Sequence, residues 1–176
     1  MNKQFLNPRF FMITLMVLAA AALRLLPHYP NFTPVAGMAL FGGAYFSNKK
    51  IAFVIPFAAM LLSDLILGFH STMWAVYLSF ALIVTIGFSL RNGKKISNIF
   101  LATVSSSVLF FLITNFAVWL TGSIYPMSFA GLTECFVAAI PFFHYTMLGD
   151  LFYAGVFFGA FELAQLKFPI LSKVKI

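Results

Sequence analysis

The chain has 176 residues, of which 62% are hydrophobic, while Lys, Arg, Asp and Glu together make up only 9%. Soluble domains are about 45–50% apolar and about 25% charged, so these few charged side chains cannot cover a water-facing surface. The composition argues against a soluble enzyme, a disordered chain and a charged coiled coil, and it predicts an integral membrane protein. The net charge of +7 does not indicate nucleic-acid binding, because the basic residues are dispersed in short groups between apolar runs.

Six apolar segments, taken in chain order, are expected to cross the membrane as helices. They cover residues 10–26, 35–47, 51–69, 73–90, 99–120 and 146–165. About 20 helical residues span a hydrocarbon core of about 30 Å. The second segment is shorter and rich in glycine, so we expect either a short span shielded by its neighbours or a re-entrant segment.

One further apolar stretch, residues 131–143, lies between the last two spans. We expect it to form an interfacial helix or lid within a long outer loop between the fifth and sixth helices, since long ordered loops commonly act as lids or binding elements. The sequence thus predicts an all-α integral membrane protein, with six transmembrane helices in one bundle and a single domain over 1–176.

Basic residues predict the orientation, because Lys and Arg near span ends favour the cytoplasmic side. With six spans, ten of the 11 basic residues fall on one side, and only Arg24 falls on the other. The ten are Lys3, Arg9, Lys49, Lys50, Arg91, Lys94, Lys95, Lys167, Lys173 and Lys175. Both termini are therefore expected in the cytoplasm of a bacterium, with the chain in the inner membrane. An alternative for the N-terminus is a cleaved signal peptide ending near residues 19–22.

Four polar residues inside the apolar segments are expected at a similar depth near the outer side: Arg24, Asp64, Asn115 and Asp150. Counted along the helices, all lie within roughly 3–8 Å of the same boundary. Charges in apolar surroundings are costly, so we expect them to face the bundle interior and to pair. Three interpretations stay open: a structural ion pair, the floor of a ligand cavity, and a proton relay.

The outer loops add further candidate ligand-binding residues, namely His28, Asn31, His70, Trp74, Tyr77 and His144. Trp and Tyr also gather at any membrane interface, whereas histidines do not. A zinc site formed by the three histidines and Cys135 would match no local zinc pattern. The sequence contains no nucleotide-binding, metalloprotease or nucleophile-elbow motif, so we expect no enzyme and no resident cofactor.

Several motifs carry a resemblance to a known group of proteins. They are RLLPH at 24–28, NFTPVA at 31–36, LSDL at 62–65, GFH at 68–70 and LGDLF at 148–152. With these motifs, the chain resembles a family of small bacterial membrane proteins of unassigned function, and it is similar to the substrate-binding S components of energy-coupling-factor vitamin transporters. Within that group, the solitary cobalamin-transporter branch is the most similar.

That resemblance implies binding of cobalamin or a related corrinoid at the outer face, with Cys135 as the candidate cobalt ligand. It also implies a coupling transmembrane subunit with ATPases as a possible partner. We therefore expect a vitamin-type uptake protein that binds a small molecule in an outward-facing cavity. The alternatives are an ion- or proton-coupled carrier or channel using Asp64 and Asp150, and a lipid-acting membrane enzyme with His70 or His144 as its base.

Overall fold

The computed structural model describes residues 7–122 and 124–172, which form six α-helices and a short 3-10 helix. The elements are α1 (Pro8–Leu23), α2 (Val35–Tyr45), α3 (Lys49–Leu67), α4 (Met73–Ser89), α5 (Ile96–Leu120), α6 (Phe129–Lys167) and η2 (Pro169–Leu171). This confirms the all-α fold, and each predicted segment overlaps one helix. The helices α3, α5 and α6 are long and apolar enough to cross a membrane, while α1, α2 and α4 are shorter apolar helices.

Three helices begin at polar residues whose side chains cap them. The side chain of Asn7 accepts from the backbone N–H of Arg9, and Pro8 occupies the first turn, where no backbone donor is needed. Asn48 accepts from the N–H of Lys50 at 2.8 Å and begins α3. Ser128 accepts from the N–H of Gly131 and begins α6. These caps fix where the chain turns back between apolar segments.

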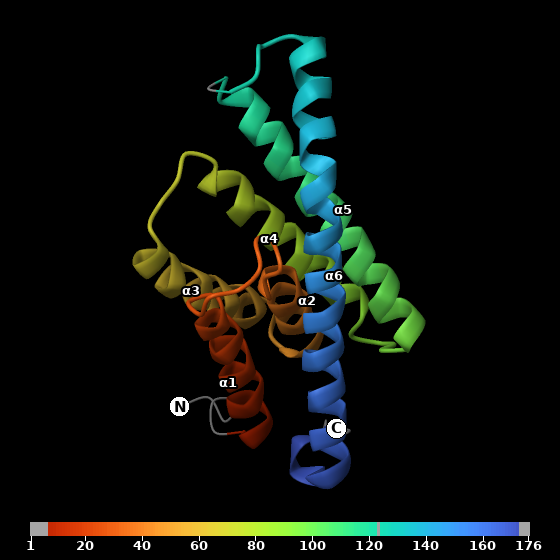
Figure 1. Ribbon diagram of the computed structural model, residues 1–176. Helices are drawn as coiled ribbons and strands as arrows, with labels where there is room; N and C mark the ends of the chain where they lie inside the picture. The colour runs from red at the N-terminus through yellow and green to blue at the C-terminus, as the bar shows by residue number, and fades with distance from the viewer. Residues whose placement is uncertain (1–6, 123, 173–176) are drawn as a thin grey trace.

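The short helix α2 lies at the centre of the bundle. All of its residues are buried, and it contacts each of the other five α-helices (Figure 1). Its length is only about 16 Å, so it does not reach across a hydrocarbon core by itself. The other helices surround it, so its residues are shielded by protein.

Glycine allows α2 to approach α4 closely. A Cβ atom on Gly43 would overlap the carbonyl oxygen of Val84, and a Cβ on Gly87 would overlap that of Leu40. Small residues let helix backbones come together in apolar surroundings, where dispersion contacts rather than water exclusion hold helices in place. Gly43 on α2 and Gly87 on α4 therefore serve the packing of these two helices.

One end of the bundle collects the basic residues, and we call it the basic end. The guanidinium of Arg91 donates to the carbonyl oxygens of Gly43 at 3.0 Å and Phe46 at 2.7 Å, joining the α4–α5 connection to the end of α2. Arg9 donates to the Leu171 carbonyl at 2.6 Å, joining the start of α1 to η2. Lys94 lies over the ring of Tyr45 at 4.9 Å. The predicted positions Lys3, Lys173 and Lys175 lie outside the described residues.

The helix α6 differs from its prediction. Residues 131–143 do not form a separate interfacial helix or lid; they are the first part of a single 39-residue helix. The expected long loop is reduced to a connection over 121–128. Figure 1 shows the α5–α6 hairpin extending beyond the ends of the other helices. Pro141 lies inside α6 without ending it, and ring contacts of Phe111 with Phe136 and Phe143 hold this part against α5.

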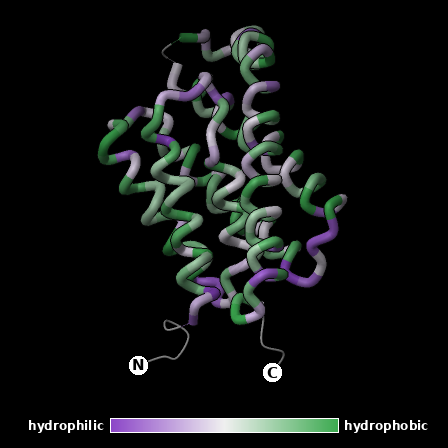
Figure 2. Tube along the Cα trace, turned by 60° about the horizontal axis from the view of Figure 1, so that its bottom comes forward, coloured by the Kyte–Doolittle hydropathy of each residue, from purple (hydrophilic) through white to green (hydrophobic). Residues whose placement is uncertain are grey.

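Large apolar side chains cover much of the outer surface of the bundle, including Ile66, Leu101 and Leu163, which are 72%, 66% and 67% exposed. In Figure 2, hydrophobic residues follow the helices while hydrophilic ones gather at the connections. A surface of this kind is unfavourable in water and suits a hydrocarbon environment. It supports a membrane protein, as the composition predicts.

Candidate functional site

Arg24 and Asp64 form the ion pair that the sequence predicts. Nη2 of Arg24 lies 2.7 Å from Oδ1 of Asp64, and the two side chains are 12% and 6% exposed. Arg24 also donates to the hydroxyl of Ser63. The hydroxyl of Tyr77 donates to Oδ2 of Asp64 at 2.8 Å. Both carboxylate oxygens are thus bonded, and the cluster ties the end of α1 to α3 and α4.

Asp150 does not join this cluster, so the expectation that it pairs with the other two charges is wrong. Its carboxyl group is 2% exposed and accepts a hydrogen bond from the hydroxyl of Ser107 at 2.7 Å. It lies between α5 and α6, whereas Asp64 lies on α3, which packs against α1, α2 and α4. The helix α2 packs between α3 and α6 and so separates the two acids.

Asn115 also lies apart from the ion pair, and its amide donates to the carbonyl oxygen of Phe111 in its own helix at 2.8 Å. Together with Asn31 it lines a half-open cavity of about 230 Å³ between α5, α6 and the segment before α2, which we call the α5–α6 pocket. Its other lining residues are Phe110, Phe111, Thr114, Ala139, Phe142, Phe143 and Thr146. Among the described residues no charged side chain lines it, so its walls are aromatic rings, two amides, two hydroxyls and Ala139.

Backbone geometry explains the position of Asn31. Its φ angle is 63°, in the left-handed region that Asn tolerates better than most residues. The following N–H, of Phe32, bonds back to the carbonyl oxygen of Tyr29 at 3.0 Å, which closes a turn. The same segment packs on α6, because Gly149 leaves room for the backbone of Phe32 and Thr33. The turn therefore places an amide at the rim of the α5–α6 pocket.

The three histidines are exposed, and none of them lines the pocket. Nδ1 of His28 lies 2.7 Å from the Leu26 carbonyl oxygen, and Nδ1 of His70 lies 3.1 Å from the Thr72 hydroxyl. The ring of His144 lies against that of Tyr145. Within residues 7–122 and 124–172, no three His, Cys, Asp or Glu side chains come close enough to hold a metal ion, so the structure does not bring the histidines and Cys135 together.

Trp74 and Cys135 also lie away from the pocket. Trp74 is 49% exposed at the start of α4, as expected for a residue at a membrane interface. Cys135 is buried, and its thiol donates to the Asn115 carbonyl oxygen at 3.4 Å. Because this thiol faces α5 rather than the pocket, the geometry does not present it as a ligand for cobalt.

Sequence reasoning missed most of the pocket wall. The rings of Phe111 and Phe143 and the hydroxyls of Thr114 and Thr146 were not candidates, because apolar and threonine residues inside a span look like ordinary packing. The available signal was the spacing of three or four residues on both helices, which places Phe111 with Thr114 or Asn115, and Phe143 with Thr146, on one face.

A second and larger hollow, of about 500 Å³, lies between the start of α5 and the second half of α6, and we call it the basic-end groove. Lys94 and Glu162 lie at its basic end, and the hydroxyl of Tyr45 donates to Glu162. Gly155 and Gly159 face open space there, since a Cβ on either would meet nothing within 4 Å. Its wall is apolar as far as Thr103 and Leu151.

Comparison with known proteins identifies a family whose function is unknown. No curated protein and no solved structure matches the chain. Residues 4–171, almost the whole chain, match the model of DUF6580, which is described as a family of unknown function. The chain therefore belongs to the DUF6580 family.

Proposed function

We propose that this protein is the substrate-binding membrane component of a vitamin-type uptake system, resembling energy-coupling-factor S components, and that it binds a small neutral molecule in the α5–α6 pocket. The observation that carries the proposal is the lining of that pocket, where aromatic rings meet two amides and two hydroxyls without any charge. Rings stack on a planar ligand, and a few polar groups fix its orientation.

The size of the pocket narrows the ligand class. Pockets for drug-sized ligands commonly measure about 300–1,000 Å³, and this one measures about 230 Å³. A flat single- or double-ring molecule with polar edges suits it. A corrinoid, which the sequence resemblance implies, is much larger, so its binding would require the α5–α6 hairpin to move away from Asn31.

The proposal places the chain in a bacterial inner membrane as six spans, with the basic end and both termini in the cytoplasm. The start of α1, the end of α2, the α4–α5 connection and η2 all lie at the basic end, which supports this topology. The basic residues gathered there support the orientation. The α5–α6 pocket then opens on the outer side. Since the chain carries no nucleotide-binding motif, energised uptake would use a partner coupling subunit with ATPases.

Binding is tested by thermal-shift measurement of the purified full-length protein against a panel of vitamins, their precursors and cobalamin. We expect one planar, uncharged compound to raise the unfolding temperature. Replacement of Thr146 by Val keeps the side-chain shape but removes a pocket hydroxyl, and it should weaken binding about twofold to tenfold, the worth of one hydrogen bond. Failure of every compound to stabilise a folded sample would contradict the proposal.

Thr85→Val provides the matched control. Thr85 is exposed on α4, and like Thr146 it donates to the carbonyl oxygen four residues earlier. The substitution removes the same kind of hydroxyl bond at a distance from the pocket. The Thr85→Val variant should therefore bind the ligand with the affinity of the unmodified protein. Equal losses of affinity in the Thr85→Val and Thr146→Val variants would show that the pocket is not the binding site.

The second candidate is an ion- or proton-coupled carrier, and the structure favours only one of its two acids. Asp64 is held by Arg24 and Tyr77 through both carboxylate oxygens, so its charge is compensated in place. Among the described residues, Asp150 has no such partner. It lies where α5 and α6 pack together, which we call the α5–α6 seam, and this position supports the candidate.

A further inference from the structure

Asp150 is a buried acid with no basic partner among the residues that the structure describes. It is 2% exposed, and among the described residues the hydroxyl of Ser107 is the one side chain that hydrogen-bonds to it. An ionised carboxylate buried with one neutral donor and no counter-charge is costly, and such a group tends to take up a proton instead. Asp64 shows the contrasting arrangement, an acid whose charge is balanced by Arg24 at 2.7 Å.

The elements packed against α6 bring no charge to Asp150. The helices are α2, α5 and η2, which contain no Asp, Glu, Lys, Arg or His, and their one titratable side chain is Tyr45, which bonds to Glu162 at the basic end. The connection before α2 also packs on α6, where Phe32 and Thr33 lie against Gly149. Its Arg24 is paired with Asp64, its His28 is exposed, and its Tyr29 lies against Tyr145.

On α6 itself, Tyr153 is one helical turn from Asp150 and its ring lies against Phe32. Glu162 is twelve residues from Asp150 along α6, about 18 Å. His144 is six residues away in the other direction, about 9 Å.

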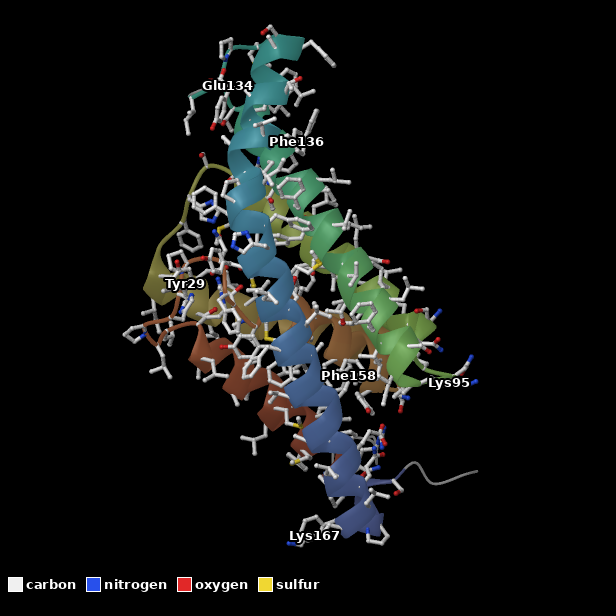
Figure 3. The ribbon with its side chains drawn as sticks, turned by 45° about the vertical axis from the view of Figure 1, so that its right-hand side comes forward. Tyr29, Lys95, Glu134, Phe136, Phe158 and Lys167 are labelled. Atoms are coloured by element: carbon white, nitrogen blue, oxygen red, sulfur yellow. The ribbon has the colours of Figure 1, made fainter. Side chains whose placement is uncertain are left out.

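Two hollows approach Asp150 from opposite ends of the α5–α6 seam. The α5–α6 pocket reaches Thr146 on α6 and Phe110 on α5, and the basic-end groove reaches Leu151 and Thr103. The pair formed by Asp150 and Ser107 lies between these positions on both helices, about one helical turn from Thr146 and Thr103. Figure 3 shows the two helices side by side above and diverging towards Lys95 and Lys167, where the groove opens.

We propose that Asp150 is a proton-binding site in the middle of a proton pathway along the α5–α6 seam. The carboxylate takes a proton from a hydronium ion in water that enters the α5–α6 pocket, which leaves a water molecule and a neutral acid. After the seam shifts, the acid releases the proton to water in the basic-end groove and becomes a carboxylate again. The hydroxyl of Ser107 donates a hydrogen bond to Oδ2 of Asp150, so Oδ1 is the oxygen that takes up the proton.

This inference goes beyond ligand binding and does not require the ligand to be known. It predicts a protonated carboxyl group in the resting protein, which infrared spectroscopy detects as a carbonyl stretching band. The chain has only four Asp and Glu residues, so the band is assignable. In the full-length protein in liposomes, we expect one band that disappears as the pH is raised and that is missing in Asp150→Asn. A missing band, or a band that survives in Asp150→Asn, overturns the proposal.

Proton movement is tested in the same liposomes, with a pH-sensitive dye inside and acid added outside. Entry should be faster than in protein-free liposomes, and it should fall to that background in Asp150→Asn. The asparagine keeps an oxygen for Ser107, so the variant retains the hydrogen bond that joins α5 to α6. Entry at background rate in the unmodified protein, even with the infrared band present, would overturn the pathway.

Glu134→Gln is the matched control, because Glu134 is an exposed acid on the same helix. It should keep both the band and the proton entry. If Asp150→Asn does not fold, a membrane-permeant carbodiimide, which adds to protonated carboxyl groups, is applied to the unmodified protein. Mass spectrometry should then find the label on Asp150 and not on Asp64, with proton entry blocked; a label on Asp64 alone would contradict the proposal. None of these measurements uses the vitamin panel, so the two proposals fail separately.

Discussion

Several hydroxyl groups in this bundle form their hydrogen bonds within their own helix. The hydroxyls of Ser79, Ser106 and Thr114 donate to carbonyl oxygens four residues earlier, at 2.7 Å each. Such bonds satisfy a hydroxyl within its own helix, so a serine-rich stretch in α5 does not by itself indicate a polar path. Ser107 differs because it also bonds to an acid on another helix.

The ion pair between Arg24 and Asp64 makes a prediction at the residue scale. Asp64→Ala leaves a buried guanidinium without its partner, which typically lowers the free energy of unfolding by about 3–5 kcal/mol. The paired replacement Arg24→Met with Asp64→Leu should lower the free energy of unfolding by less than the sum of the losses caused by Arg24→Met alone and Asp64→Leu alone, because no charge is left uncompensated in the pair. Denaturation of the detergent-solubilised variants measures both. Strictly additive losses would show that the two side chains do not stabilise each other.

Helices show how packing overrides local signals. By length α2 is too short to span a membrane, yet it is fully buried because five helices surround it. The helix α6 contains Gly131 and Pro141, which are residue types common in loops, yet α6 continues through both. The aromatic contacts of Phe111 with Phe136 and Phe143 are made across two helices, so no pattern within one segment reveals them.

The closest approach of α2 and α4 makes a prediction at the scale of elements. Gly43→Ala places a methyl group against the backbone oxygen of Val84, which cannot move without displacing α4. Overpacking of this kind costs about 1–3 kcal/mol in the free energy of unfolding. Gly159→Ala is the control, since nothing lies within 4 Å of its added methyl group. Thermal denaturation should show a clear loss for the first and none for the second; equal stability would contradict the packing of α2 on α4.

The topology of the whole molecule makes a prediction about the two sides of the membrane. Alkaline phosphatase inserted within residues 121–128 should be active, since the enzyme requires an oxidising exterior to form its disulfides. The same insertion after Lys95, at the basic end, should be inactive. Green fluorescent protein fused to the C-terminus should fluoresce if that end is cytoplasmic. Activity after Lys95 would reverse the proposed orientation.

Much of this structure can be predicted from the amino-acid sequence, because the composition and length of an apolar segment determine whether it can span a hydrocarbon core. The all-α class, the six helical segments and the pairing of Arg24 with Asp64 are of this kind, since a charge in an apolar segment requires a partner. Counting residues along a helix also estimates the depth of a side chain.

Depth does not determine which neighbour a side chain meets. The position of α2 between α3 and α6 separates Asp64 from Asp150, and that position depends on contacts between segments far apart in the chain, such as Gly43 with Val84. Contacts between distant segments also hold residues 131–143 of α6 against α5 and place Asn31 and Asn115 in one pocket. These features depend on side chains that fit together in three dimensions, and a linear pattern carries no record of that fit.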